Sequence, residues 1–373
     1  MVQLKQRDQK IQQFVRLLET QGPNIDAIAK TIGVHEETVR YWYQKRLLAR
    51  GYTVQTVVDY GKLGLRRLIV YADVAQPYLT ISANVFREMA SRGYLSYYAS
   101  TIPTGSYILA PLVPNECIDA YMGFLQELKS KGFFSDLSEV LQFDWWRNMP
   151  MKGEDYDFKS HTWEVDLIPK MSGRISMIST AERCEFDRTD LQILEQLQPD
   201  SNKRMNDIAR AIGISQSGVL RHSKHILDRK LVKMYRLNWA GTGMGSRRQK
   251  PLTSKHRYLN LTISVRDVKK DELQGLLLAL HRLPFLWAEG GGRNYICELF
   301  IPLDLVNDVL TFLTGAIRPF RKRAVVLIEN QNDAFSSGIT PELYDQKTKR
   351  WTFDSAAALD RVDKLLVSVK EPR

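Results

Sequence analysis

Residues 186–232 read FDRTDLQILEQLQPDSNKRMNDIARAIGISQSGVLRHSKHILDRKLV, and this stretch predicts three short helices around one small core. Asp187 suits the position that caps the first helix, and Asp190 follows three residues later, where its carboxylate can reach back to a free amide. Apolar residues recur at helical spacing through 191–197, which gives this helix one buried face. Pro199 ends it, and Gly213 supplies the left-handed residue that ends the second helix.

The third helix is expected to begin at its cap, Ser215, and to divide into a core face and an open face. The core face consists of Val219, Ser223, Ile226 and Leu227. The open face consists of Ser215, Gln216, Ser217, Arg221 and Lys224. Arginine can bind guanine and glutamine can bind adenine through paired hydrogen bonds, while lysine can hold a phosphate. The pattern therefore predicts a helix-turn-helix that enters the major groove of DNA, and the competing interpretation is a small three-helix unit with a solvated outer face.

The same stretch resembles a known family. The patterns F-D-x-x-D-x-x-I-L-x-x-L and I-A-x-x-I-G-I-S-x-S-x-V-x-R, followed by L-V, are similar to the winged helix-turn-helix of the Lrp/AsnC (feast/famine) transcription regulators. The resemblance implies a helix-turn-helix followed by a ferredoxin-like sandwich. It also implies pairing through the sheets and small ligands, often amino acids, between sandwiches.

Composition narrows the class of protein. The 373 residues predict two to four domains at ~100–200 residues each. The net charge of +11 is compatible with a polyanionic partner. The three cysteines are far apart, so neither a zinc ribbon nor a disulfide framework is indicated. The N-terminus is polar and no run of ~18 apolar residues occurs, so we expect a cytoplasmic protein that does not contact a membrane.

Residues 8–60 contain a diverged copy of the helix-turn-helix, in which Ile32 and Gly33 stand 180 positions before Ile212 and Gly213. Its third helix is expected over 35–50, and an extended wing follows. The candidate DNA-contacting residues in this copy are Arg40, Tyr41, Gln44 and Lys45. Two glutamates at the start of the helix would repel phosphates, so docking of a partner or a purely structural role stays open for this copy.

Residues 64–148 and 257–330 each predict the order β-α-β-β-α-β, the ferredoxin-like sandwich with helices on one face of an antiparallel sheet. Alternating apolar residues indicate the first strand of each. Tyr107-Ile108 precedes Tyr295-Ile296 by 188 positions, and a Y-D-x-K…W-x-x-D tail repeats at the same interval. The chain therefore reads as a tandem duplication and resembles a covalently joined dimer. Each tail is expected to be an arm that packs on its own sandwich, with a solvated linker as the alternative.

Residues 241–257 are rich in Gly and Ser and hold Arg247, Arg248 and Lys250 without an acid. A mobile wing that follows phosphates and a flexible linker are equally compatible with this composition.

The effector site implied by the resemblance falls on Gly105, Tyr107, Gly291 and Tyr295. Isoleucine follows the tyrosine in both copies, where the family commonly has an acid, which weakens the case for amino-acid sensing. The Gly290–Gly292 run is either a loose hairpin or a place where a ligand approaches the backbone.

Catalytic and cofactor signals are missing from the sequence. His222 and His225 stand three apart on a helix, but no third metal ligand is in view nearby, so no metal and no cofactor are expected. No Walker loop, G-x-S-x-G, H-E-x-x-H or Rossmann fingerprint occurs, so no enzyme is expected.

We therefore expect an α+β chain in which two winged helix-turn-helix domains alternate with two ferredoxin-like (βαββαβ) domains. The expected domain boundaries are 1–62, 63–148, a tail at 149–183, 184–240, a basic linker or wing at 241–256, 257–330 and a tail at 331–373. The expected function is sequence-specific binding of double-stranded DNA in transcription regulation, with a small-molecule effector and a homo-oligomer left open. The alternative is a ligand-sensing or interaction scaffold whose winged helices dock protein or RNA.

Overall fold

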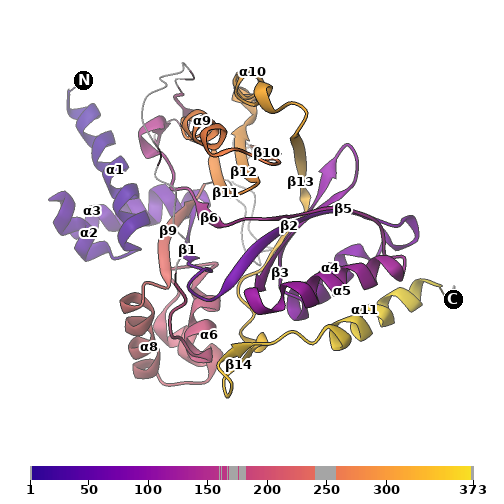
Figure 1. Ribbon diagram of the computed structural model, residues 1–373. Coiled ribbons are helices and arrows are strands. Elements are labelled where there is room, and N and C mark those ends of the chain that lie inside the picture. The colour runs from indigo at the N-terminus through magenta and orange to yellow at the C-terminus, as the bar shows by residue number, and fades with distance from the viewer. Residues whose placement is uncertain are drawn as a thin grey trace.

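The computed structural model describes residues 2–158, 160, 162–165, 167, 175, 182–239 and 258–370. Helices and strands are mixed along the chain, and the expectation of an α+β fold is confirmed (Figure 1). None of the helices in the described ranges is both long and apolar enough to cross a membrane.

The first helical module comprises α1 (Val2–Gln21), α2 (Ile25–Ile32) and α3 (Glu36–Tyr41). Asn24 caps α2 by accepting a hydrogen bond from the backbone N–H of Ala27 at 3.2 Å, and Gly33 ends it at φ 70°. The helix expected over 35–50 is α-helical only to Tyr41, and it continues as a π-helix over Trp42–Leu47 and a 3-10 turn over Leu48–Arg50. Strand β1 (Thr53–Val58) then forms the wing.

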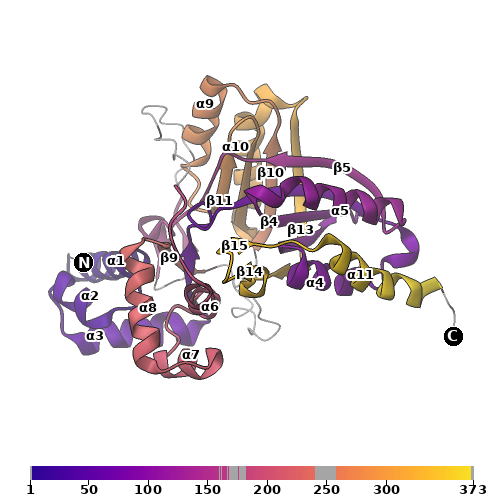
Figure 2. The same cartoon turned by 60° about the horizontal axis from the view of Figure 1, so that its bottom comes forward.

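The second helical module comprises α6 (Arg188–Leu197), α7 (Met205–Ile212) and α8 (Gln216–Asp228), followed by strand β9 (Val232–Asn238). Strands β1 and β9 pair with each other in an antiparallel ladder from Thr53↔Asn238 to Val58↔Val232. The two wings are therefore joined, and the two helical modules lie together on one side of the molecule (Figures 1 and 2).

Two β-α-β-β-α-β units follow the expected pattern. The first contains β2 (Leu65–Val74), α4 (Ser82–Arg92), β3 (Leu95–Ile102), β4 (Tyr107–Pro114), α5 (Ile118–Ser130) and β5 (Phe134–Gln142). The second contains β10 (Tyr258–Val265), α9 (Lys270–Leu280), β11 (Leu286–Gly291), β12 (Tyr295–Pro302), α10 (Val306–Ile317) and β13 (Ala324–Ser336). Within each unit the first strand lies between the third and the fourth, which is the ferredoxin-like order.

The two units share one sheet of nine described strands, ordered β5-β2-β4-β3-β13-β10-β12-β11-β6. Strand β13 extends beyond its own unit and also pairs with β3 of the first unit, with Ala334 opposite Ala99. Strand β6 (Trp145–Asn148) follows β5 in the chain but pairs with β11 of the second unit, with Trp146 opposite Gly290. Strand β6 of the first half therefore extends the outer edge of the second unit, whereas β13 joins the two units at the centre of the sheet.

The tails exchange partners as well. The first tail contains a 3-10 turn (Gly153–Asp155), β7 (Tyr156–Asp157) and β8 (Thr162–Trp163), and Trp163 packs edge-on against Phe285 of the second unit at 5.2 Å between ring centroids. The second tail contains β14 (Tyr344–Asp345), β15 (Arg350–Trp351) and α11 (Ser355–Lys370), and Trp351 packs against Tyr94 of the first unit. The prediction that each tail packs on its own sandwich was wrong.

The hydrophobic core divides along the same crossed pattern. One buried cluster joins the first helical module, the first tail and the second sandwich, and another joins the second helical module, the second tail and the first sandwich. The first helical module thus packs on the second sandwich, and the second helical module packs on the first sandwich. The paired wing strands contribute residues to both clusters.

Candidate nucleic-acid interface and central cavity

The second helical module folds as its sequence predicts. The backbone N–H of Asp190 donates to Asp187 Oδ1 at 2.9 Å, and the N–H of Asp187 donates to Asp190 Oδ2 at 3.0 Å, so both carboxylates cap α6. Gly213 ends α7 at φ 74°, and the Ser215 hydroxyl caps α8 by accepting from the N–H of Gly218 at 3.1 Å. These caps fix where α8 begins and in which direction it leaves the module.

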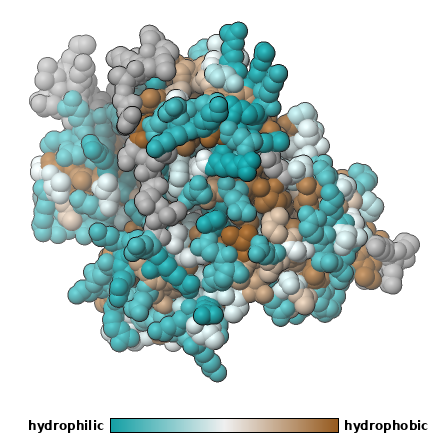
Figure 3. Space-filling view, in the orientation of Figure 1, coloured by the Kyte–Doolittle hydropathy of each residue, from teal (hydrophilic) through white to brown (hydrophobic). Residues whose placement is uncertain are grey.

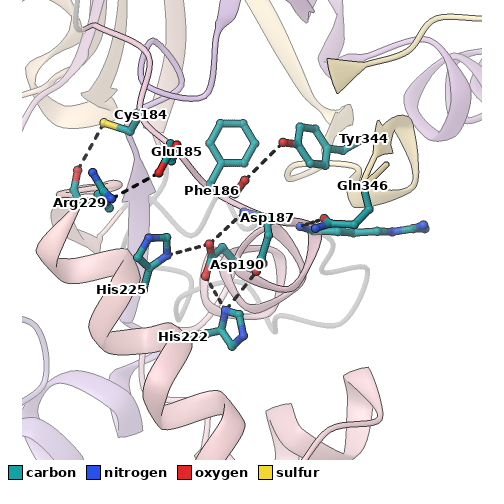
Figure 4. Close-up of polar contacts among 11 residues, drawn as sticks. Cys184, Glu185, Phe186, Asp187, Asp190, His222, His225, Arg229, Tyr344 and Gln346 are labelled. Atoms are coloured by element: carbon teal, nitrogen blue, oxygen red, sulfur yellow. Dashed lines mark hydrogen bonds and ion pairs between the residues drawn. The ribbon is translucent and has the colours of Figure 1, made fainter. Parts of the chain in front are cut away.

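Asp190 also joins α8 to α6. Its fully buried carboxylate accepts a hydrogen bond from His222 Nδ1 at 2.8 Å on one oxygen and from His225 Nδ1 at 2.9 Å on the other. Figure 4 shows Asp190 between the two imidazoles that extend from α8. The second tail adds a further tie, because the Tyr344 hydroxyl donates to the carbonyl oxygen of Phe186 at 3.3 Å. The start of α6 and one side of α8 are therefore held at several points.

This cluster contains more metal-binding atoms than the sequence indicated. Asp187, Asp190 and His222 each offer a ligand atom, and these atoms lie within 4.8 Å of one another, so the expectation that no third ligand lies near was wrong. The carboxylate and imidazole atoms are joined by direct hydrogen bonds, and both carboxylates already accept backbone amides. That bonding accounts for the cluster as a device that positions α8.

No other described part of the chain covers the open face of α8. The predicted residues Ser215, Gln216, Ser217, Arg221 and Lys224 are all exposed. Arg221 and Lys224 form no ion pair with any described residue, so their charges face outward. Hydrophilic residues dominate the lower left of the space-filling view, the region of α8 in Figure 1 (Figure 3). Val219 and Ile226 are buried as expected, but Leu227 is 55% exposed, so its assignment to the core was wrong.

The first module presents a different surface. Arg40, Tyr41, Gln44 and Lys45 are exposed at the end of α3 and the start of the π-helix, as the predicted role requires. The guanidinium of Arg40, however, is paired with Glu36 and lies 3.3 Å from Glu37. Its charge is thereby largely neutralised on its own helix. The basic residues Arg247, Arg248 and Lys250 lie outside the described residues.

The predicted effector residues are not brought together. Gly105 is exposed in the β3–β4 hairpin, whereas Tyr107 is buried and its hydroxyl lies 3.1 Å from Ser82 in the first unit. Tyr295 is buried in the second unit and donates to Glu289 at 2.7 Å. Gly291 of β11 lies against Trp145 of β6, and none of these four residues lines the cavity described next.

A cavity with unusual chemistry lies between the joined wings and the centre of the shared sheet. It has two adjoining lobes of about 240 and 340 Å³, and Arg67 of β2 lines both. Arg236 of β9 lines the first lobe and is only 6% exposed. It stands opposite Gln55 in the wing ladder, and its Nη2 donates a hydrogen bond to Gln55 Oε1 at 3.2 Å. Arg67 donates to Ser96 at 3.4 Å.

Most of the hydrogen-bonding capacity of these two guanidinium groups is unused. Arg67 Nε and Arg236 Nε and Nη1 are buried and have no hydrogen-bond partner among the described residues. Burial lowers the pKa of Arg67, and it lowers the pKa of Arg236 to about 10. An arginine guanidinium is not deprotonated in proteins at neutral pH. A buried unpaired charge costs several kcal/mol, which makes two of them facing one cavity a strong signal for an anion.

The acids nearby do not neutralise these charges by contact. Burial raises the pKa of Glu298, which lines the cavity but forms no ion pair with either arginine. Burial likewise raises the pKa of Glu329 to about 7, and that carboxylate is occupied by Asn260 at 2.7 Å and by the hydroxyl of Tyr97. The first lobe therefore keeps a net positive charge.

Trp146, which forms part of one wall of the cavity, packs against the glycine run of the second unit. Gly290 and Gly291 lie inside strand β11, and a Cβ on Gly290 would stand 2.6 Å from the ring of Trp146. The bare backbone lets the indole of Trp146 approach closely there, and the ring in turn lies 4.8 Å from the guanidinium of Arg67. Trp287 supports Arg236 in the same way at 3.6 Å. Gly290 and Gly291 therefore belong to the strand, and Gly292 begins the hairpin that leads to β12.

Comparison with known proteins gives a domain match over a short segment and a fold match over nearly the whole chain. Residues 186–222 match the AsnC-type helix-turn-helix domain, and no curated protein matches the chain. The crystal structure of the siroheme decarboxylase NirDL superposes with a TM-score of 0.51 at 9% identity, covering 97% of this chain and 100% of that one. NirDL in co-complex with an iron-uroporphyrin III analogue gives 0.48 at 10% identity over 93% of each chain. E. coli AsnC gives 0.27 at 13% identity, covering 39% of this chain and 92% of its own.

One expectation is overturned by these comparisons. The absence of familiar catalytic motifs led us to expect a protein that is not an enzyme. NirDL has this fold over its whole length and is a decarboxylase, so neither the fold nor the missing motifs exclude catalysis.

Proposed function

We propose that this chain is a sequence-specific, double-stranded-DNA-binding transcription regulator of the Lrp/AsnC type, and that α8 is its reading helix. The observation that carries the proposal is that Arg221 and Lys224 are exposed on a capped helix inside an AsnC-type helix-turn-helix, with no ion-pair partner in the part of the chain that the structure describes. Gln216 and Ser217 at the start of that helix are suited to base edges, since residues at the start of a recognition helix commonly reach into the groove.

We further propose that the chain is a tandem duplication that forms a covalently joined pseudo-dimer. The repeated order of elements, the β1–β9 ladder and the pairing of β6 and β13 with strands of the other unit support this. Two modules on one side of the molecule would face two half-sites. Because Arg40 is neutralised on its own helix, the first copy should contribute less, through Tyr41, Gln44 and Lys45. The basic residues 247–250 would add phosphate contacts.

Binding to genomic duplex fragments over a range of salt concentrations tests the proposal. Arg221→Ala should weaken binding and reduce the slope of log affinity against log salt by about 1 if Arg221 holds a phosphate. Arg361→Ala is the matched control, because Arg361 is equally exposed on α11, and α8 and α11 lie at opposite sides in both views (Figures 1 and 2). Equal binding by both variants and the unmodified chain would remove α8 as the reading helix. Capture of single-stranded RNA in place of duplex would favour the scaffold alternative.

A second candidate function is an enzyme that removes carbon dioxide from a carboxylate of a tetrapyrrole, as the name of NirDL states for that protein. Two observations favour it: the full-length fold match, and the cavity in which Arg67 and Arg236 can bind carboxylates. Siroheme incubated with the chain should then lose the mass of carbon dioxide, and Arg236→Gln should abolish the loss while Arg361→Gln keeps it. An unchanged siroheme mass with the unmodified chain would rule out this activity.

A further inference from the structure

One end of the second sandwich carries a concentrated positive charge. Three segments form it, 266–272, 292–294 and 318–323, and we call them the basic end. Their eight basic residues are Arg266, Lys269, Lys270, Arg293, Arg318, Arg321, Lys322 and Arg323. The only acids in the three segments are Asp267, Asp271 and Glu272. Eight positive charges less three negative ones leave +5, nearly half of the +11 on the whole chain.

Backbone and side-chain hydrogen bonds hold the three segments together. The N–H of Val268 donates to the carbonyl oxygen of Arg293 at 2.8 Å, and the N–H of Arg266 donates to that of Arg323 at 3.1 Å. The guanidinium of Arg323 also donates to Glu272 Oε1 at 2.9 Å, which ties the start of β13 to the first turn of α9. The charges of the basic end are therefore presented on a framework with fixed connections.

The acids neutralise only part of this charge. Asp267 pairs with Arg293 at 2.7 Å and Glu272 pairs with Arg323, whereas four exposed basic residues form no ion pair with any described residue. These four are Lys270, Arg318, Arg321 and Lys322. Lys270 is also the first residue of α9, where the helix dipole disfavours a cation. Mutual repulsion of exposed like charges costs stability, and a polyanion on this surface would remove that cost.

The basic end lies away from the reading helix. Strand β10 begins beside the wing, where the ring centroids of Tyr258 and Trp239 are 5.0 Å apart, and it ends at Val265, directly before the basic end. An extended segment of that length spans roughly 23 Å. Helices α9 and α10, which border the basic end, lie at the top of both ribbon views, and α8 lies at the lower left (Figures 1 and 2). Hydrophilic residues project from the same top region of the space-filling view (Figure 3).

We propose that the basic end binds the phosphate backbone of double-stranded DNA, at a second site separate from α8 and without reading sequence. Lysine and arginine contacts to phosphates carry no information about the bases. One chain could then hold a second segment of duplex in addition to the one at α8. This inference goes beyond the proposed function, because contact between the basic end and phosphates does not require α8 to read DNA.

The surface favours a duplex over other polyanions. Proteins that bind single strands stack the bases on exposed aromatic rings, and helices that bind a membrane surface bury an apolar face. None of the large hydrophobic side chains that are exposed in the described chain lies in the three segments of the basic end. Phe320, the aromatic residue of the turn, is only 5% exposed. Charge without stacking rings or apolar anchors suits the outer phosphates of a duplex.

The experiment isolates the basic end by weakening α8 first. The full chain carrying Arg221→Ala and Lys224→Ala is titrated into a fluorescein-labelled duplex of two helical turns and arbitrary sequence, and anisotropy is followed over a range of salt concentrations. We expect residual binding that weakens as salt rises. Adding Arg321→Gln and Lys322→Gln should weaken this binding at least tenfold at 0.1 M salt and reduce the slope of log affinity against log salt by about 2, because two phosphate contacts are lost.

The matched control adds Arg361→Gln and Lys364→Gln, which remove the same two charges from exposed positions on α11 and should change neither quantity. If the Arg321 and Lys322 variant melts at a lower temperature, Lys270→Gln with Arg318→Gln replaces it. Absence of residual binding overturns the proposal, and so does an equal loss in the two pairs of variants. Tighter residual binding to a single-stranded oligonucleotide, or to phosphatidylserine vesicles, overturns the choice of duplex.

The same titrations keep the two proposals apart. Unchanged affinity of genomic duplexes for the Arg221→Ala chain counts against α8 as the reading helix and leaves the basic end as proposed. Loss of affinity there, with no residual binding once Lys224→Ala is added, supports α8 and removes the basic end.

Discussion

Replacing Gly290 with alanine is expected to destabilise the protein and deform the cavity, because the new methyl group has no room. Its Cβ would stand 2.6 Å from Cε3 and 3.0 Å from Cζ3 of Trp146, and 3.3 Å from Cγ of Phe143. Carbon atoms in favourable contact are about 3.5–4.0 Å apart, so the indole must move by nearly 1 Å. Phe143 is 3% exposed and offers little space for that movement.

The magnitude follows from two opposing effects. Forcing an extra methyl group into a packed site costs about 1–3 kcal/mol. The φ of Gly290 is not in the left-handed region, so alanine can adopt this backbone and gains about 0.4–1 kcal/mol by restricting the unfolded chain. The midpoints of the two ranges give an expected net loss of about 1.3 kcal/mol in the free energy of unfolding.

The assay is urea unfolding followed by tryptophan fluorescence, with Gly275→Ala as the matched control. Gly275 lies inside α9, and a Cβ there would meet nothing within 4 Å. The control should gain about 0.5–1 kcal/mol, since alanine favours helix over glycine. The two variants thus have opposite expected signs. If Gly290→Ala unfolds at the same or a higher urea concentration than the unmodified chain, the packing of Trp146 on β11 has been misjudged, and with it one wall of the cavity.

Three further predictions concern the caps and one buried acid. Gly213→Ala should lose about 1–2 kcal/mol in urea unfolding, because a Cβ at φ 74° strains the backbone although nothing lies within 4 Å of it. Asp190→Asn should lose about 1.5–3 kcal/mol, since one amide oxygen cannot accept from both His222 and His225, and duplex binding should fall with it. Burial raises the pKa of Glu19 to about 8 from 4.5. Its contribution to stability is therefore complete below about pH 4.5 and is lost as pH rises through about 8. Glu19→Gln should flatten this fall, and an unchanged profile of unfolding free energy against pH would contradict it.

The helical modules were predictable because their signals are local. Asp187, Asp190, Gly213 and Ser215 act within three or four residues of their own positions, and the structure places each as the sequence indicates. The failure at Leu227 has a local cause too. It lies in the last turn of α8, where the module's core has already been closed by Ile226, so its side chain extends into solvent.

The crossed packing was not predictable in the same way. Periodicity identifies which face of a strand is buried, but it does not say which unit covers it. Residues 334–336 continue β13 beyond its own sandwich, and only the three-dimensional register shows that β3 receives them. The same limit explains the tails, whose aromatic residues were correctly expected to pack but were assigned to the wrong sandwich.

The cavity was missed for a related reason. Arg67 and Arg236 are 169 positions apart, and neither belongs to a motif. The Gly290–Gly292 run was the one readable signal, and its meaning depends on Trp146, which reaches it from the first half of the chain. Two adjacent tryptophans and an unexplained glycine run are complementary shapes, and pairing them would have located this wall.

The pairing of Gln55 with Arg236 suggests what a joined chain achieves that a symmetric dimer cannot. The two residues face each other in the ladder between the wings. At the 180-position offset of the helical modules, Gln55 corresponds to Tyr235 and Thr56 corresponds to Arg236. A homodimer with an equivalent ladder would therefore pair glutamine with threonine, or tyrosine with arginine, and would not place an amide opposite a guanidinium. A single chain can place one guanidinium opposite one amide, and the amide then holds the guanidinium at 3.2 Å without neutralising it. For the pseudo-dimer proposed above, covalent joining would permit a cationic, asymmetric cavity between the two copies.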